Sequence, residues 1–157
     1  MRKILILILL IIITLPSFAK EVINFDKTCD KEASKILYEY IKKEYSMSFL
    51  ELTNVTKESC IATFYDLDSD GESEILGYVS SFAFQGTAGY SLYILKKNTE
   101  YEDITSIMNF YPWLGITVLD SKTEKYYDLS FYGNKQKIPI VVKYNKKWQY
   151  YEYFSSD

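Results

Sequence analysis

A short acidic turn between two apolar runs constrains this chain more than any other stretch. Residues 64–79 read FYDLDSDGESEILGYV, in which five carboxylates fall within nine residues. The apolar runs on either side predict the two strands of a hairpin. Like charges packed this closely near a surface repel by about 1 kcal/mol or more per close pair. This repulsion favours a cation bound in the turn over an empty turn.

The spacing of these carboxylates is that of the front half of a calcium-binding loop. In such a loop positions one, three and five present side-chain oxygens to the ion, position six turns sharply and position seven offers its backbone carbonyl. These positions are occupied in order by Asp66, Asp68, Asp70, Gly71 and Glu72, and Glu74 at position nine is a further ligand, direct or through water. We therefore predict a bound calcium ion with a structural role. The alternative is a polar hairpin turn that needs no metal.

The segment from Cys60 to Leu95 resembles a known type of calcium hairpin. An EF-hand has helices on both sides of its loop and a bidentate Glu at position twelve, which here is Gly77. The segment is more similar to the EF-hand-like loops of FG-GAP-type repeats, in which an acidic residue at position nine replaces the missing twelfth. The resemblance is to small secreted bacterial proteins with one such unit, mostly of unknown function, and it implies a calcium-organised hairpin.

Residues 1–19 have the pattern of a signal peptide. A positive start at Arg2 and Lys3 precedes an apolar run from 4 to 15, and small residues precede the expected cleavage site at Lys20. An apolar helix of this length spans about 18 Å, short of the ~30 Å hydrocarbon core of a bilayer. We therefore expect a periplasmic or secreted protein with no stable membrane span after signal cleavage, rather than a membrane-anchored one.

Residues 20–157 are enough for one domain and too few for two. Apolar side chains recur at spacings of three and four from Lys27 to Glu44, which predicts an amphipathic helix. The segment from Phe49 to Thr56 reads as a strand, and 116–154 as a four-stranded meander. The prediction is a single α+β domain, with one N-terminal amphipathic helix packed on a mainly antiparallel β-sheet or meander and the acidic loop at 66–74.

The chain has two cysteines, Cys29 and Cys60, so only one intramolecular pairing exists. In an oxidising compartment a disulfide is the default state of such a pair. This disulfide would join the predicted helix to the strand that leads into the acidic turn. The alternative is two buried free thiols.

The composition excludes most catalytic chemistry. There is no histidine, which removes the usual general base, the common nucleophile pairs and most zinc sites. The dense carboxylates lie in one turn, where a metal would occupy them, so we expect no enzymatic activity. The formal net charge of −3 argues against nucleic acid as a partner.

Aromatic residues on glycine- and proline-containing segments are the candidates for partner contacts. Tyr90 follows a glycine-rich turn, and Tyr111 and Trp113 flank Pro112. Such rings supply large contact areas at interfaces, although tyrosine is also a common half-buried strand residue. We expect a small exported, non-catalytic binding protein for an unidentified protein or glycan. The alternatives are a periplasmic inhibitor or immunity protein that blocks a cell-wall hydrolase such as lysozyme, and a surface or adhesion component.

Overall fold

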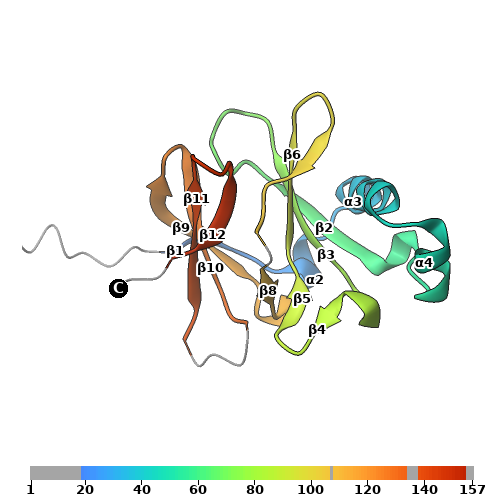
Figure 1. Ribbon diagram of the computed structural model, residues 1–157. Coiled ribbons are helices and arrows are strands. Elements are labelled where there is room, and N and C mark those ends of the chain that lie inside the picture. Colours follow the sequence, from blue (N-terminus) through green and yellow to red (C-terminus); the bar gives the residue numbers. More distant parts are fainter. Residues whose placement is uncertain (1–18, 107, 134–137, 155–157) are drawn as a thin grey trace, which may run out of the picture.

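The computed structural model describes residues 19–106, 108–133 and 138–154 (Figure 1). Across these residues the chain combines helices with mainly antiparallel sheets, as predicted. The predicted signal peptide lies outside the described residues, except for Ala19, which begins the first strand. No helix in the described ranges has the length and apolar character needed to cross a membrane.

The first sheet holds the predicted C-terminal meander. Its strands lie in the order β1 (Ala19–Ile23), β9 (Ile116–Thr123), β10 (Tyr126–Phe131), β11 (Ile140–Asn145) and β12 (Tyr150–Tyr153). All neighbouring pairs are antiparallel. β1 is not predicted from the sequence, because four of its five residues are exposed and carry no strand-like apolar alternation.

The second sheet contains the predicted acidic hairpin. Its antiparallel strands lie in the order β2 (Cys60–Tyr65), β3 (Glu74–Val79), β6 (Tyr93–Lys97) and β7 (Tyr101–Asp103). A third, small sheet consists of β4 (Gln85–Gly86), β5 (Gly89–Ser91) and β8 (Asn109–Phe110). The predicted glycine-rich turn joins β4 to β5.

The prediction of a single helix is wrong, because the described residues form three: α2 (Phe25–Thr28), α3 (Lys31–Glu44) and α4 (Met47–Leu52). The predicted helix from Lys27 is interrupted at Asp30. The Asp30 carboxylate accepts hydrogen bonds from the backbone N–H groups of Glu32 and Ala33, at 2.8 and 2.9 Å, and so starts a new helix. Cys29 consequently lies between two helices and not on the apolar face of one.

The predicted strand from Phe49 to Thr56 is also wrong, because α4 occupies its first half. The Ser46 hydroxyl accepts from the Phe49 N–H at 3.3 Å and caps this helix. Asn54, in the left-handed region at φ 51°, follows its end. Local capping therefore outweighs the strand preference of the aromatic and β-branched residues in this segment.

Two apolar cores result from this arrangement. In Figure 1, α3 and α4 lie on the side of the second sheet that faces away from the first sheet. Leu37 of α3 packs here, and a Cβ at Gly77 would lie 2.9 Å from its Cδ2 and 2.6 Å from the Ala62 Cβ. Gly77, at position twelve of the calcium-loop pattern, thus allows close approach of helix and strands. The other core contains side chains of both large sheets, among them Leu76 and Leu129.

Candidate functional site

The loop between β2 and β3 extends from the second sheet toward the first (Figure 1). Leu67, its second residue, is fully buried in the core that both sheets share. The Leu67 carbonyl accepts from the Tyr127 N–H of β10 at 2.8 Å, and its N–H donates to Glu74 Oε2 at 2.9 Å. The start of the loop is therefore fixed to both sheets, while residues 69–73 are exposed.

Inside the loop the backbone curls around its own carboxylates. The two oxygens of Asp66 accept from the N–H groups of Asp70 and Gly71, at 3.2 and 3.1 Å. Asp68 Oδ1 accepts from the Asp70 N–H at 3.3 Å. Gly71 has φ +90°, which is the sharp turn predicted for position six. The conformation agrees with the calcium-loop pattern at these positions.

Three of the five predicted ligands form a cluster that could hold a metal ion. Asp66, Asp68 and Glu74 each present an oxygen, and these atoms lie within 4.8 Å of one another. Asp68 and Glu74 are buried and Asp66 is half-buried. Asp70 and Glu72 are exposed and outside this cluster, although Asp70 accepts from the Glu72 N–H. A hard cation such as calcium prefers all-oxygen sites of this kind.

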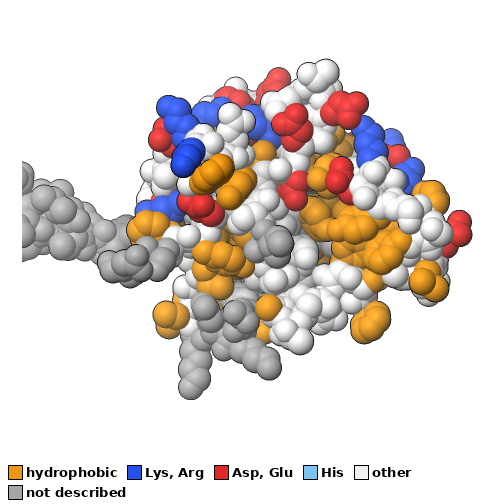
Figure 2. Space-filling view, in the orientation of Figure 1, with side chains coloured by type: hydrophobic (Ala, Val, Ile, Leu, Met, Phe, Trp, Pro, Cys, Tyr) orange, Lys and Arg blue, Asp and Glu red, His pale blue; other side chains and the backbone are white. Residues whose placement is uncertain are grey.

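Lysine side chains contact the same carboxylates. Lys96 of β6 places its Nζ 3.0 Å from Asp68 Oδ2 and 3.0 Å from Glu74 Oε1. Lys125, in the turn between β9 and β10, forms an ion pair with Asp68 Oδ2 as well. Lys122 of β9 donates to the Asp68 carbonyl at 3.3 Å. Three ammonium groups therefore already supply positive charge to the loop, and Figure 2 shows acidic and basic side chains gathered along the top of the molecule.

These contacts determine the charge states. Burial acts to raise the pKa of Asp68, but hydrogen bonds and charge from Lys125 and Lys96 outweigh it and lower the pKa to about 2. For Glu74 burial dominates and raises the pKa, although Lys96 and the Leu67 N–H act against it. Burial alone would lower the pKa of Lys96, yet its hydrogen bonds, including those to Asp68 and Glu74, raise it. At neutral pH Asp68 and Lys96 are thus a charged pair.

The cluster can hold a calcium ion only if the Lys96 and Lys125 ammonium groups move away from its carboxylates. The oxygens of Asp68 and Glu74 nearest to Lys96 belong to two of the three ligands. A cation bound to both would take the place of the Lys96 ammonium, because two positive charges at these distances repel. Lys96 is thus an internal counter-ion at the position where an external one would bind.

The two cysteines are free thiols in the structure, with Cys29 exposed and Cys60 buried. Both line one pocket of about 370 Å³ beside α3. Cys29 Sγ lies 3.6 Å from the Ser34 hydroxyl, and burial raises the pKa of the Cys60 thiol to about 12. The disulfide is not formed in this structure and stays a prediction.

The three candidate partner-binding rings differ in exposure. Tyr90 is half-buried in β5 and its ring lies 5.4 Å from that of Tyr78 in the core. It therefore does not occupy the tip of a turn. Tyr111 and Trp113 stack with ring centroids 5.0 Å apart, and Trp113 is 59% exposed. Trp113 offers the largest free surface of the three.

The sequence-based prediction did not include these lysines, although a signal for two of them, Lys122 and Lys125, exists. From Glu51 to Asp103 the chain has ten acids and three lysines, whereas from Lys122 to Asp157 it has seven lysines and four acids. Such segregation indicates that the two segments attract each other within the fold. The excess of acids predicts a bound ion, but in the structure Lys122 and Lys125 of the C-terminal segment supply part of the compensating charge.

No family model, curated protein or solved structure matches this chain. The similarity to FG-GAP-type hairpins therefore rests on the loop residues alone.

Proposed function

We propose that this chain is a small exported, non-catalytic binding protein whose two sheets are joined by a calcium-organised loop. The observation that carries the proposal is the convergence of Asp66, Asp68 and Glu74 oxygens within 4.8 Å at a loop docked on both sheets. Export is inferred from the N-terminal sequence pattern. The lack of histidine favours a binding role over catalysis.

In this proposal the Lys96 ammonium and the calcium ion compete for the same carboxylates. Without calcium, Lys96 and Lys125 neutralise Asp68 and keep the loop closed. When calcium binds, Asp66, Asp68 and Glu74 hold it, and the two ammonium groups move away. This competition predicts weak binding, in the range of about 10⁻⁴ to 10⁻³ M that extracellular calcium modules show. At ~1 mM calcium and a Kd near 10⁻⁴ M the ion would add roughly 1.4 kcal/mol of stability.

The test compares melting temperatures of the mature protein in calcium and in chelator. Calcium should raise the melting temperature of the wild type, and Asp66→Asn should remove that increase. Lys96→Met should enlarge the increase, because it removes the competing cation. Glu51→Gln, an exposed acid on α4, is the matched control and should behave as wild type. If calcium leaves the melting curves of both wild type and Lys96→Met unchanged, the calcium proposal is wrong.

The second candidate function is inhibition of a cell-wall hydrolase such as lysozyme. It is supported by the exposed Trp113 and Leu114, which follow a buried proline and are 59% and 50% exposed. Rings of this kind are common anchors of protein interfaces. Purified mature protein should then inhibit a muramidase, and Trp113→Ala should reduce that inhibition. A lack of inhibition across several muramidases would contradict this function.

A further inference from the structure

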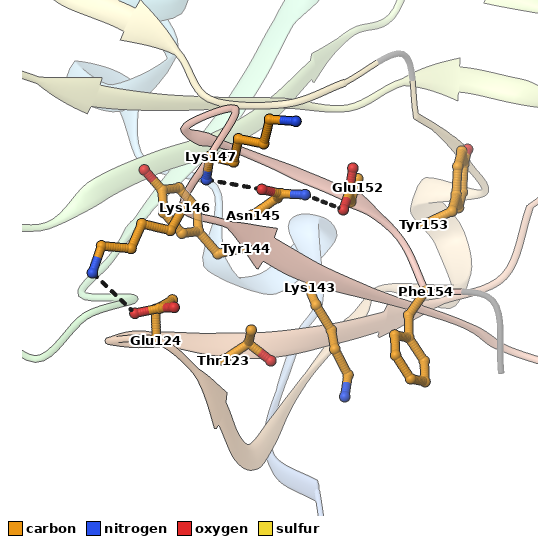
Figure 3. Close-up of a pocket in the computed structure, with 10 residues that line it drawn as sticks. All are labelled: Thr123, Glu124, Lys143, Tyr144, Asn145, Lys146, Lys147, Glu152, Tyr153 and Phe154. Atoms are coloured by element: carbon orange, nitrogen blue, oxygen red, sulfur yellow. Dashed lines mark hydrogen bonds and ion pairs between the residues drawn. The ribbon is translucent and has the colours of Figure 1, made fainter.

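A second polar site lies on the hairpin of β11 and β12. A pocket of about 490 Å³ opens beside the β9–β10 turn (Figure 3), within the size range of pockets that bind small molecules. Its lining combines three lysines and two acids with aromatic rings, and the residues used below are Thr123, Lys143, Asn145, Glu152, Tyr153 and Phe154. The proposed calcium loop contributes no residue to it.

Lys143 is held in position at this pocket. Its Nζ lies 3.9 Å from the centroid of the Phe154 ring, and Figure 3 shows both side chains pointing the same way. It also lies 3.9 Å from Asp128 Oδ2, too far for a hydrogen bond. The hydrogen-bond donors of this ammonium therefore have no acceptor among the described residues.

Asp128 is the buried anion behind Lys143. Its side chain is 2% exposed, and Oδ2 accepts from the Ser121 hydroxyl at 2.7 Å. Across the described residues, Oδ1 has no hydrogen-bond partner. A buried carboxylate that is only partly satisfied attracts the nearest cation, here Lys143. Asp128 is thus a positioning residue that keeps the Lys143 ammonium at the pocket.

The remaining lining supplies apolar rings and hydrogen-bonding groups. Phe154 is 50% exposed, so the part of its ring that Lys143 does not cover is open to a ligand. Tyr153 is 45% exposed, but its hydroxyl accepts from the Asn109 N–H and Figure 3 shows its ring directed away from that of Phe154. Thr123 offers a hydroxyl. The Asn145 amide is oriented by donating to Glu152 and by accepting two backbone N–H groups of its own turn, so it offers its remaining N–H. A saccharide ring matches this combination, because its C–H face packs on aromatic rings and its hydroxyls bond amide and hydroxyl groups. A carboxylate on the sugar would pair with a lysine.

We propose that this pocket binds a carboxylated saccharide, with its carboxylate on Lys143 and its ring against Phe154. The proposal gives a ligand class to the binding role inferred above and does not depend on calcium. An inorganic anion would leave the exposed ring of Phe154 unused, whereas a saccharide ring packs against it. The ligand is therefore a single anionic sugar or short oligosaccharide.

The test is calorimetric titration of trigalacturonate and of neutral maltotriose into mature protein, in buffer with chelator. Trigalacturonate should bind and maltotriose should not. Lys143→Gln should weaken trigalacturonate binding about tenfold or more, the usual effect of removing one charge-assisted contact. Phe154→Ala should weaken it as well. Lys35→Gln, an exposed lysine on α3, is the matched control and should leave binding unchanged.

The role of Asp128 is tested by combining variants. Asp128→Asn should weaken binding in the wild type but have no further effect in the Lys143→Gln background, because it acts through that lysine. Equal additional loss in both backgrounds would overturn the positioning role. The whole proposal is overturned if trigalacturonate gives no binding, if maltotriose binds equally well, or if Lys143→Gln and Lys35→Gln have the same effect. Because chelator is present throughout, these outcomes are independent of the calcium test.

Discussion

In the loop between β2 and β3, the side chains of Asp68 and Glu74 are 0% and 2% exposed and share Lys96. In the turn between β11 and β12, Lys146 is 79% exposed and lies 3.8 Å from Glu124 of the neighbouring turn. Both places pair lysines with acids, but only the first removes the charges from water. A desolvated charge is costly to leave unpaired, whereas an exposed pair contributes little. The β2–β3 loop is therefore a structural joint, by which we mean that its buried side chains hold the two large sheets together. The β11–β12 turn keeps its charged side chains in solvent, where a ligand can reach them.

The largest loss of stability should come from replacing Leu67, the apolar residue inside the β2–β3 loop. Leu67→Ala removes a fully buried side chain from the core shared by the two sheets and should lower the free energy of unfolding by about 2–5 kcal/mol. Leu52→Ala is the matched control, since Leu52 is 83% exposed and its loss should change stability by less than about 0.5 kcal/mol. Urea denaturation measures both. A similar small change in both variants would show that the loop is not a joint.

The second largest loss of stability should come from replacing Lys96, the lysine that Asp68 and Glu74 share. Lys96→Met leaves Asp68 and Glu74 buried without their common cation, and in calcium-free buffer it should cost about 3 kcal/mol of unfolding free energy. Calcium should restore part of this loss if the proposed ion takes the vacated place. Urea denaturation with and without calcium measures it. A loss no greater than that of a surface lysine would contradict the role given to Lys96.

The sequence predicts the loop well because its information is local. The alternation of Asp66, Asp68 and Asp70, followed by Gly71, fixes a curled backbone through contacts between residues at most five positions apart. The flanking strands and the C-terminal meander are also local patterns, set by apolar runs and turns. These features could be predicted without knowledge of the tertiary structure.

The parts that the sequence does not predict depend on distant residues or on single caps. Lys125 reaches Asp68 across 57 positions because two sheets are packed together, which no periodicity indicates. Asp30 and Ser46 redirect the chain through single side-chain caps, so a helix begins where the pattern predicts a continued helix or a strand. The Asp128–Lys143 pair at the pocket comes from strand register, which the sequence does not specify.

The pH dependence of the free energy of unfolding tests the charge states of the two buried acids in the loop, beginning with Asp68. The lowered pKa of Asp68, about 2 against a usual 3.8, means that Asp68 stabilises the fold above pH 4 and loses this effect as pH falls toward 2. The contribution at neutral pH is about 2 kcal/mol, so Asp68→Asn should be less stable than wild type by that amount and converge with it near pH 2. Unfolding by urea in calcium-free buffer across this pH range measures the difference.

Glu74 is the comparison for Asp68, because its contribution to stability should change with pH in the opposite direction. Its pKa is raised by burial, so protonation favours the folded state and stability due to this group is lost as pH rises through the folded pKa. Glu74→Gln should therefore remove a pH dependence of opposite sign to that of Asp68. If both variants change the pH profile in the same direction, the charge states assigned to the loop are wrong.

The smallest effect should be the coupling between Lys146 and Glu124. Their side chains are 79% and 47% exposed and 3.8 Å apart, so a double-mutant cycle of Lys146→Met and Glu124→Gln should give a coupling below about 0.5 kcal/mol. The same cycle on Lys96 and Asp68 should give a coupling several times larger, because that pair is largely shielded from solvent. Added salt should reduce the first coupling and leave most of the second, since screening acts on exposed charges. Equal couplings that respond equally to salt would mean that burial does not distinguish the two sites, and that the β11–β12 turn is as much a structural joint as the acidic loop.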